Sequence, residues 1–194
     1  MLDQNVTRLS ARPPLRGKRS LLRDVLEIAL LVLITFTPIN LMTARAIVDG
    51  PSMQPTFHTG NLVIVNRLAY FFSPPQRGDV IVLHNPRYEG GDDLIKRVIG
   101  LPNETIELKD GRVYVNGVRL EEPYVRDFCG LGCNGTWRLS ATQYFVLGDN
   151  RPQSYDSHNF GPIERHLIVG QAWVKYWPLS EFSIIEHPNY RNLP

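Results

Sequence analysis

This chain of 194 residues has few cysteines and a small net charge. The chain has 2 cysteines, Cys129 and Cys133, and no Cys/His set with the spacing of a zinc site surrounds them. Lys and Arg number 21 against 19 Asp and Glu, so bulk charge predicts no nucleic-acid partner. Internal repeats and low-complexity tracts are also missing from the sequence. We therefore expect no metal, no cofactor and no nucleic acid.

The two cysteines stand in the segment Cys-Gly-Leu-Gly-Cys, where the glycines allow the chain to close a small loop. This composition favours a disulfide between Cys129 and Cys133, which requires an oxidising compartment. The alternative is a pair of free thiols in a surface loop.

The N-terminal part of the chain is basic and then strongly apolar. Residues 1–23 are polar and carry prolines, which is typical of a disordered tail. The segment from Val25 to Ala44 has about the length that crosses a bilayer. It could be an anchor, a cleaved signal peptide or a core helix. Its poor cleavage site and the absence of a polar stripe over 29–34 favour the anchor.

An anchor at residues 24–46 predicts how the chain is placed across the membrane. A basic tail before a membrane span stays on the cytoplasmic side, so residues 47–194 would form an extracytoplasmic domain. This placement agrees with the expected disulfide. The default membrane is the plasma membrane, and an internal membrane with a luminal domain is the alternative.

The remainder of the chain has the pattern of short β-strands. Apolar, β-branched runs bounded by turn residues occur at residues 61–66, 79–84, 94–99, 143–147 and 168–177. Residues 105–118 contain Asp-Gly and Asn-Gly pairs, which predict a meander of three strands. No segment after Ala46 has a convincing helical period. We expect a mainly β fold of curved, barrel-like antiparallel sheets after one N-terminal transmembrane helix.

One loop in this β region is unusually aromatic. Tyr70, Phe71 and Phe72 precede Pro74 and Pro75, and aromatic side chains are not expected to stand free in water. They form either a core cluster or an apolar surface that rests on the membrane.

The first candidate for chemistry is Ser52, which lies between Pro51 and Pro55 on a stretch that cannot be helical. Such a stiff turn suits a nucleophile, although a serine between prolines is also an ordinary turn residue. A nucleophilic serine needs a base, and none of the five histidines shares a recognisable triad motif with it.

Lys96 is the better candidate for the base. Strand alternation places it on one face with Leu94 and Val98, so the lysine points toward a core or a cleft. Burial lowers the pKa of a lysine, and a neutral amine can take a proton from a serine hydroxyl. The alternative is an edge lysine whose ammonium group reaches water.

Four segments of the sequence together resemble the motifs of the type I signal peptidases. Residues 50–57 resemble the nucleophile motif, and residues 77–82 resemble the next one. Residues 96–102 resemble the lysine motif, and residues 148–157 resemble the last motif. The motifs follow one N-terminal span in the order of the family. The resemblance runs from about Val25 to Trp177 and implies a signal-peptidase fold of the β-clip type.

The resemblance implies a serine endopeptidase with a Ser/Lys dyad. Ser52 would attack the scissile carbonyl, and neutral Lys96 would be the general base. Ser154 matches the serine that orients the lysine amine, and Asp149 and Asp156 match residues that brace the last motif. No cofactor is implied.

The family's substrate pockets match a further set of positions. They are lined in the family by residues that correspond to Val48, Met53, Phe57, Leu94 and Ile95. Shallow apolar pockets there would accept small side chains at the −1 and −3 positions of a signal peptide. The implied partners are signal peptides of exported preproteins, membrane lipid and the export machinery.

Three departures from the family pattern occur. Asn103-Glu104 replaces the usual Gly-Asp after the lysine motif, and the other two concern Gly50 and His158. Gly50 stands where part of the family has a serine that donates to the oxyanion hole, so the hole would rely on backbone amides or another donor. His158 stands where an arginine commonly pairs with the aspartate matched by Asp156, which predicts a pH-sensitive brace.

Three other functions remain as alternatives. A self-cleaving repressor would need a DNA-binding domain, for which residues 1–46 are too short and too apolar. A specialised peptidase for one partner protein has the same motifs. An inactive membrane-anchored β module that binds exported peptides would not need the intact serine and lysine.

Overall fold

The structure is a computed structural model that describes residues 21–88, 90–130, 133–188 and 190. The chain divides into two compact units, residues 1–38 and residues 39–194, and each is described by itself. The expected tail of residues 1–23 lies outside the described residues up to position 20, and positions 21–23 are helical.

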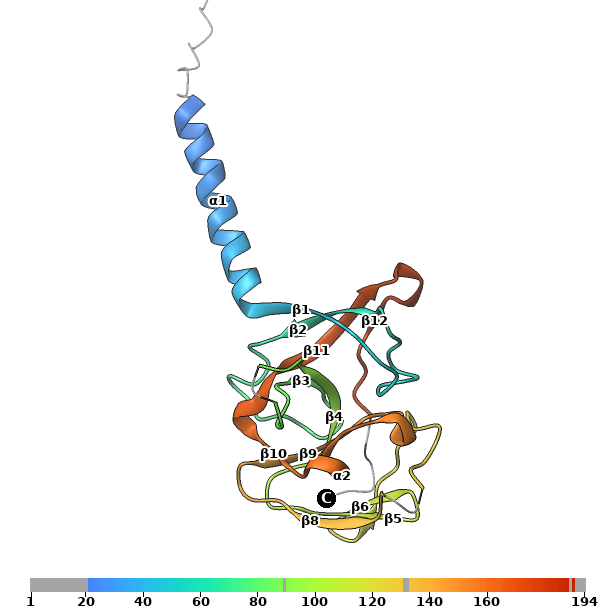
Figure 1. The fold of residues 1–194 in the computed structure, drawn as a ribbon. Helices are drawn as coiled ribbons and strands as arrows, with labels where there is room; N and C mark the ends of the chain where they lie inside the picture. Colours follow the sequence, from blue (N-terminus) through green and yellow to red (C-terminus); the bar gives the residue numbers. More distant parts are fainter. Residues whose placement is uncertain (1–20, 89, 131–132, 189, 191–194) are drawn as a thin grey trace, which may run out of the picture. The chain divides into compact units, whose positions relative to one another are not determined.

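The apolar N-terminal segment forms one helix, α1 (Leu21–Met42), shown in blue in Figure 1. At about 1.5 Å per residue its 22 residues span about 33 Å, close to the hydrocarbon thickness of a bilayer. None of its residues is buried, so most of its apolar surface is exposed. Length and composition make α1 a candidate membrane span, consistent with anchoring.

The helix ends earlier than the expected segment of residues 24–46. Its last residue is Met42, because residues 43–47 are extended as β1 and pair with a neighbouring strand. Arg67 donates its backbone N–H to the carbonyl of Met42 over 2.9 Å, which ties this helix end to the turn after that strand.

The second unit is mainly β and contains a large antiparallel sheet of 8 strands (Figure 1). Its strands pair in the order β1-β2-β11-β3-β4-β9-β10, with β12 added to β11. Their bounds are β1 (Thr43–Ile47), β2 (Leu62–Asn66), β3 (Val80–Leu83), β4 (Leu94–Gly100), β9 (Gln143–Leu147), β10 (Ile163–Glu164), β11 (Ile168–Trp177) and β12 (Ser183–Ile184). Register shifts interrupt the pairing of β11 with β2 and β3, and of β4 with β9. Such bulges increase the local twist, and the sheet curls.

A second antiparallel sheet has 4 strands in the order β7-β6-β5-β8. Their bounds are β5 (Thr105–Lys109), β6 (Arg112–Val115), β7 (Val118–Arg119) and β8 (Gly135–Arg138). The turns between the first three strands use Asp110 and Asn116, both at a φ of 50°, each followed by glycine. This is the meander that the Asp-Gly and Asn-Gly pairs predict.

The remaining elements are short. The helix α2 (Ser157–Phe160) follows three residues after the 3-10 turn η2 (Arg151–Gln153), and two further 3-10 turns, η3 (Arg165–Leu167) and η4 (Leu179–Glu181), flank β11. The sequence predicts the strands within residues 61–66, 79–84, 94–99, 105–118, 143–147 and 168–177 and the antiparallel, mainly β fold class, which are confirmed. It did not predict β1, β8, β10, β12 or α2, since each is short and lacks a clear period.

Three groups of buried apolar side chains hold the second unit together. One lies between the two sheets and joins Ile106 of the smaller sheet to Phe145 of the large sheet, and one lies around Ile81 and Val146 in the large sheet. The third joins Val48, Met53, Phe57, Val63, Val80 and Ala172. This third cluster anchors the loop after β1 to the large sheet and thereby fixes the position of Ser52.

The aromatic loop divides between the two expected roles. Tyr70 packs against the core and donates its hydroxyl to Asp79 over 2.8 Å. Phe71 and Phe72 stay 77% and 87% exposed. Tyr70 is therefore a core residue, and the two phenylalanines form an apolar surface.

Candidate active site

Ser52 lies on a tight loop between β1 and β2. Backbone hydrogen bonds close the loop, from Gln54 N–H to the Pro51 carbonyl at 3.0 Å and from Phe57 N–H to the Met53 carbonyl at 2.9 Å. Gly50 enters the loop with a φ of 88°, a left-handed conformation that side-chain-bearing residues rarely adopt. The local backbone therefore explains the glycine at this position, where a serine would be strained.

The loop is also held from the segment that follows β9. Asn150 donates its backbone N–H to the Ser52 carbonyl at 3.0 Å, and its side chain donates to the Pro51 carbonyl at 3.1 Å. The motif at residues 148–157 thus supports the motif at residues 50–57 directly. Asn150 lies inside the last motif, but its sequence context does not indicate this role.

Lys96 is placed opposite Ser52 by the centre of β4, where it pairs with Ile81 of β3. Its side chain is buried, with 3% of the residue exposed. The amine Nζ lies 2.9 Å from Ser52 Oγ and donates to the carbonyl of Ile95 at 3.0 Å. The structure thus brings together the two residues that the sequence analysis selected as nucleophile and base.

The surroundings favour the neutral form of this amine. Burial lowers the pKa of Lys96 to about 8 from an ordinary value of 10.5, while the charges of Asp156 and Asp149 act in the opposite direction. A hydrogen-bonded amine with this pKa can accept the proton of a serine hydroxyl near neutral pH.

A cleft of about 560 Å³ opens beside Ser52 and Lys96. Val48, Leu94 and Ile95, three of the residues expected in substrate pockets, are among the residues that line it. Met53 and Phe57 are fully buried in the cluster that includes Val48, so they support the wall of the cleft from beneath.

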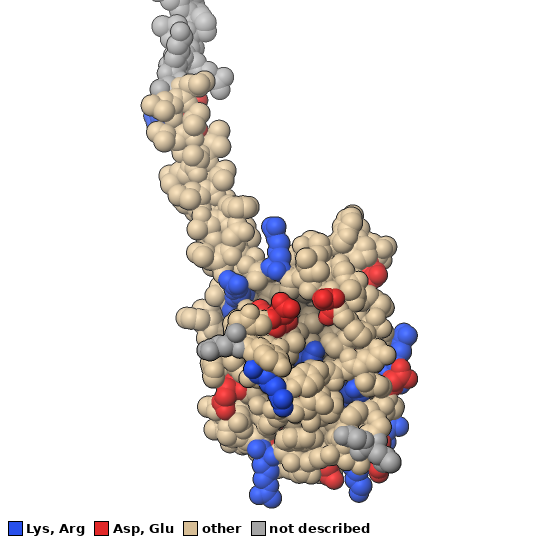
Figure 2. Space-filling model, viewed as in Figure 1, with Lys and Arg blue, Asp and Glu red and all other residues tan. Residues whose placement is uncertain are grey.

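The cleft has further lining residues that the sequence analysis did not select. They include Tyr155 and three acidic residues, Asp49, Asp92 and Asp93. Figure 2 shows acidic side chains gathered at a hollow on the face it presents. The mouth of the cleft therefore combines apolar and acidic surface.

Behind Ser52, Asp149 forms a buried ion pair with Arg97. Two hydrogen bonds join them, from Nε to Oδ1 at 2.8 Å and from Nη2 to Oδ2 at 2.7 Å. The hydroxyl of Thr56 also donates to Asp149 Oδ2 at 2.5 Å, and Arg97 donates to the Gly78 carbonyl at 2.8 Å. Asp149 thus joins three of the four motifs. The sequence analysis missed Arg97 and Thr56, although both lie inside recognised motifs.

Ser154 is buried next to this network without the hydrogen bond to Lys96 that the resemblance implies. Its Oγ has no hydrogen-bond partner in the part of the chain that the structure describes. A Cβ placed on Gly148 would collide with Ser154 Oγ and with the Ser52 carbonyl. Gly148 therefore permits the nucleophile loop and Ser154 to approach each other.

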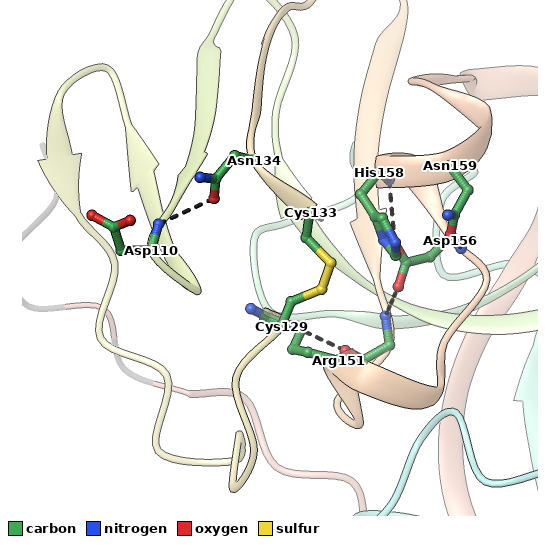
Figure 3. Close-up of a disulfide and its surroundings, with 9 residues drawn as sticks. Asp110, Cys129, Cys133, Asn134, Arg151, Asp156, His158 and Asn159 are labelled. Carbon is green, nitrogen blue, oxygen red and sulfur yellow. Dashed lines mark hydrogen bonds and ion pairs between the residues drawn. A yellow bond between two sulfur atoms is a disulfide. The ribbon is translucent and has the colours of Figure 1, made fainter. Parts of the chain in front are cut away.

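Asp156 is fully buried and holds the backbone of the last motif at Gly148 (Figure 3). Its Oδ2 accepts the backbone N–H of Gly148 at 2.8 Å, and its Oδ1 lies 2.7 Å from Nδ1 of His158. Asp156 also caps α2, in a capping box with Asn159. His158 therefore occupies the position beside this aspartate that the resemblance assigns to a cation.

A second buried ion pair supports the last motif from outside. Arg151 and Glu122 each have only 3% of the side chain exposed, and their groups pair through two hydrogen bonds. Arg151 also donates to the Gly148 carbonyl at 3.0 Å. Nothing in the sequence pattern around Glu122 indicated this role, because the two residues meet only in the fold.

The segment that follows Glu122 carries the two cysteines. Cys129 and Cys133 are joined by a disulfide with their Cα atoms 5.9 Å apart (Figure 3). The fold brings His158 to them, so that one ligand atom from each of the three residues lies within 4.8 Å of the others. Spacing along the chain could not reveal this group, since His158 is remote in sequence.

Comparisons with known proteins identify the family of the chain. Residues 21–177 match the family described as "Signal peptidase, peptidase S26". The chain is 41% identical to the signal peptidase I of Bacillus caldolyticus over 150 residues, covering 71% of this chain and 81% of that protein. It is 34% identical to the signal peptidase IB of Staphylococcus aureus strain MRSA252 over 188 residues, covering 88% and 97%.

A solved structure of a signal peptidase I from Enterococcus faecalis V583 is also similar. It is 36% identical, with a TM-score of 0.45, and the match covers 51% of this chain and 97% of that one.

The family match and the relatives define the chain first as a hydrolase, a serine peptidase. More narrowly, the chain belongs to the signal peptidase family, peptidase S26.

Proposed function

We propose that this protein is a membrane-anchored endopeptidase that removes signal peptides from exported preproteins, with Ser52 as nucleophile and Lys96 as general base. The observation that carries the proposal is the distance of 2.9 Å between Lys96 Nζ and Ser52 Oγ at a cleft. Membership of the signal peptidase family supports the substrate class.

In the proposed mechanism, Ser52 Oγ attacks the scissile carbonyl while its proton passes to the neutral amine of Lys96. The tetrahedral intermediate collapses to an acyl-enzyme, and the protonated amine returns the proton to the leaving amino group. A water molecule, deprotonated by the same lysine, then releases the signal peptide. The pKa of about 8 suits both directions of proton transfer near neutral pH.

The negative charge of the intermediate requires a donor, and the Ser52 backbone N–H is suited to this task. Gly50 has no side chain to contribute, and its φ of 88° disfavours a residue that has one. The loop is therefore proposed to use backbone donors, held in place by Asn150 on the Ser52 carbonyl.

Three residues are proposed to position the reacting groups. Asp149 joins Arg97 to Thr56 of the nucleophile loop, and Asp156 holds the Gly148 backbone. Ser154 is proposed to orient the Lys96 amine when substrate is bound, since its buried hydroxyl is left unpaired in the described structure.

The cleft supports a small-x-small rule for cleavage. Val48, Leu94 and Ile95 give it apolar walls, and the buried Met53 and Phe57 limit its depth from beneath. An extended peptide with alanine at −1 and −3 would fill such shallow pockets, whereas larger side chains would not.

The helix α1 is proposed to anchor the enzyme beside its substrates. The basic residues before it support a cytoplasmic N-terminus and a β-rich unit on the other side, in the plasma membrane or facing the lumen of an internal membrane. The exposed Phe71 and Phe72 support contact with lipid. The proposed partners are therefore signal peptides, membrane lipid and the export machinery.

The test is cleavage of a model preprotein carrying an Ala-x-Ala site by the detergent-solubilised full chain, with the cut located by mass spectrometry. Ser52→Ala and Lys96→Ala should each abolish cleavage. Matched controls are Ser73→Ala, an exposed serine that also precedes prolines, and Lys109→Ala, an exposed lysine on β5. Both controls should cleave normally. Substantial cleavage by Ser52→Ala or Lys96→Ala would remove that residue from the mechanism.

A further inference from the structure

The fold gathers three potential metal ligands that the peptidase mechanism does not use. Cys129 and Cys133 come from the segment between β7 and β8, and His158 comes from α2 (Figure 3). One ligand atom from each lies within 4.8 Å of the others. We propose that these three residues bind a zinc ion when the Cys129–Cys133 disulfide is reduced.

The size of the cluster fits this ion. Zinc takes thiolate sulfur at about 2.3 Å and imidazole nitrogen at about 2.0 Å, so two sulfurs in a tetrahedral site lie about 3.8 Å apart. Breaking the disulfide frees the sulfurs to separate by that amount through side-chain rotation. The Cα separation of 5.9 Å therefore needs no backbone rearrangement to serve either state.

His158 is prepared as a ligand by its carboxylate neighbour. Its Nδ1 lies 2.7 Å from Oδ1 of Asp156, which favours the tautomer with the proton on Nδ1. The lone pair is then on Nε2, the nitrogen available to a metal. A carboxylate that holds the far nitrogen of a ligating histidine is the usual outer shell of a zinc site.

Both sides of the cluster are anchored by the backbone. His158 sits on a helix that Asp156 caps, with its own N–H donated to Oδ1 of that residue at 3.3 Å. On the other side, Cys133 donates its N–H to the Gly130 carbonyl at 3.1 Å, and Asn134 accepts the N–H of Asp110 at 3.1 Å. The ligands are therefore largely in position before an ion arrives.

The cluster is accessible without being fully solvated. Cys129, Cys133 and His158 are each partly buried, so a small reductant and an ion can reach them. Asp156, which contacts His158, is fully buried and supplies a negative charge that favours a cation on the imidazole.

The change of state balances with a dithiol as reductant. The dithiol gives two electrons and two protons to the disulfide and becomes a cyclic disulfide itself, leaving two cysteine thiols. Zinc binding then releases these two protons as the thiolates coordinate. Three protein ligands leave the fourth tetrahedral position to water, as in sites of Cys and His ligands that keep an open position.

The proposal can be tested on the full chain carrying Ser52→Ala, so that peptidase activity plays no part in the result. The protein is reduced with a dithiol, transferred to anaerobic buffer and titrated with zinc, and bound zinc is counted after removal of the free ion. Cobalt titration gives a second readout, because thiolate–cobalt bonds absorb in the near ultraviolet.

The reduced protein should bind one zinc ion per chain, and the oxidised protein should bind none at this site. Cys129→Ser, Cys133→Ser and His158→Ala should each lose the ion and the cobalt absorption. Asp156→Asn should weaken zinc affinity by about 10- to 100-fold, as removal of an outer-shell partner does.

A matched control is His84→Ala. His84 also has a carboxylate partner, with Nδ1 at 2.7 Å from Asp93, but the cluster of possible metal ligands does not include it. This variant should bind zinc like its parent. Zinc binding by the reduced parent that equals binding by the Cys129→Ser/Cys133→Ser double variant would overturn the proposal, as would binding that survives His158→Ala unchanged.

Discussion

The pH dependence of cleavage gives the sharpest test of the proposed base. The pKa of Lys96 is lowered to about 8, first by burial, against the opposing charges of Asp156 and Asp149. At pH 7 a lysine with a pKa of about 8 is neutral in about 9% of molecules, against about 0.03% at the ordinary value of 10.5. Burial therefore raises the competent fraction by about 300-fold at this pH.

The expected profile follows from these fractions. Activity depends on the unprotonated amine, so kcat/KM should rise with pH along an acid limb whose midpoint is about 8. Between pH 6 and pH 8 the neutral fraction grows from about 1% to about 50%, which predicts a rise of about 50-fold in kcat/KM. Between pH 7 and pH 9 the rise should be about 10-fold.

The assay is cleavage of a fluorogenic peptide with an Ala-x-Ala site at substrate concentrations below KM, in detergent and constant ionic strength. Asp156→Asn provides the sign test. Because the negative charge of Asp156 raises the pKa of Lys96, its removal should move the acid limb to lower pH. A flat profile, a midpoint near 10.5, or a shift to higher pH in Asp156→Asn would refute this account of the base.

Four further outcomes are expected. Lys96→Arg should lose about 100- to 10,000-fold in kcat/KM despite keeping its charge, since an arginine cannot act as a base; cleavage kinetics measure this, and near-normal activity would contradict it. Lys96→Met should be more stable than the parent at pH 7 by up to about 3 kcal/mol, because the folded state must hold a buried amine whose pKa has fallen from 10.5 to about 8. The parent's stability should therefore rise with pH across that window, so that urea unfolding of the two proteins converges near pH 10.5; an advantage that does not change with pH would count against the lowered pKa. Gly148→Ala should remove activity while the protein stays folded by circular dichroism, since its Cβ meets Ser154 and the Ser52 carbonyl; full activity would show that the loop is not held as described. Glu122→Gln should lower the free energy of unfolding by about 3–5 kcal/mol, because it leaves the buried Arg151 unpaired, and a loss below about 1 kcal/mol in urea unfolding would contradict the pairing.

The main strands were predictable because local composition and the flanking turn residues favour the strand conformation. The run of β9 is bounded by turn residues and is apolar throughout, and the Asp-Gly and Asn-Gly turns fix the meander of β5, β6 and β7. By contrast, the sequence predicts most of β1 as part of the N-terminal helix, because residues 43–47 become a strand only by pairing with β2. A local sequence pattern does not indicate which distant segment a strand will pair with.

The same distinction explains which parts of the site the sequence could reveal. Local sequence patterns indicate both Ser52 and Lys96. Ser52 stands between prolines, and Lys96 is a charged residue among apolar strand residues. Arg97 follows Lys96 in β4, so its side chain lies on the opposite face of the strand. Alternation alone would predict that this side chain is exposed to solvent. It is buried because Asp149 and the Gly78 carbonyl satisfy its guanidinium from two remote segments.

The surroundings of His158 depend most strongly on the fold. The neighbouring motif predicts its pairing with Asp156, but its full environment comes from three separate features of the fold. The cap of α2 orients it, Asp156 holds one ring nitrogen, and the loop of Cys129 and Cys133 places sulfur beside the ring. The aspartate that it contacts also holds Gly148 behind Ser52. The cysteines are therefore linked to the segment next to the nucleophile loop through His158, Asp156 and Gly148.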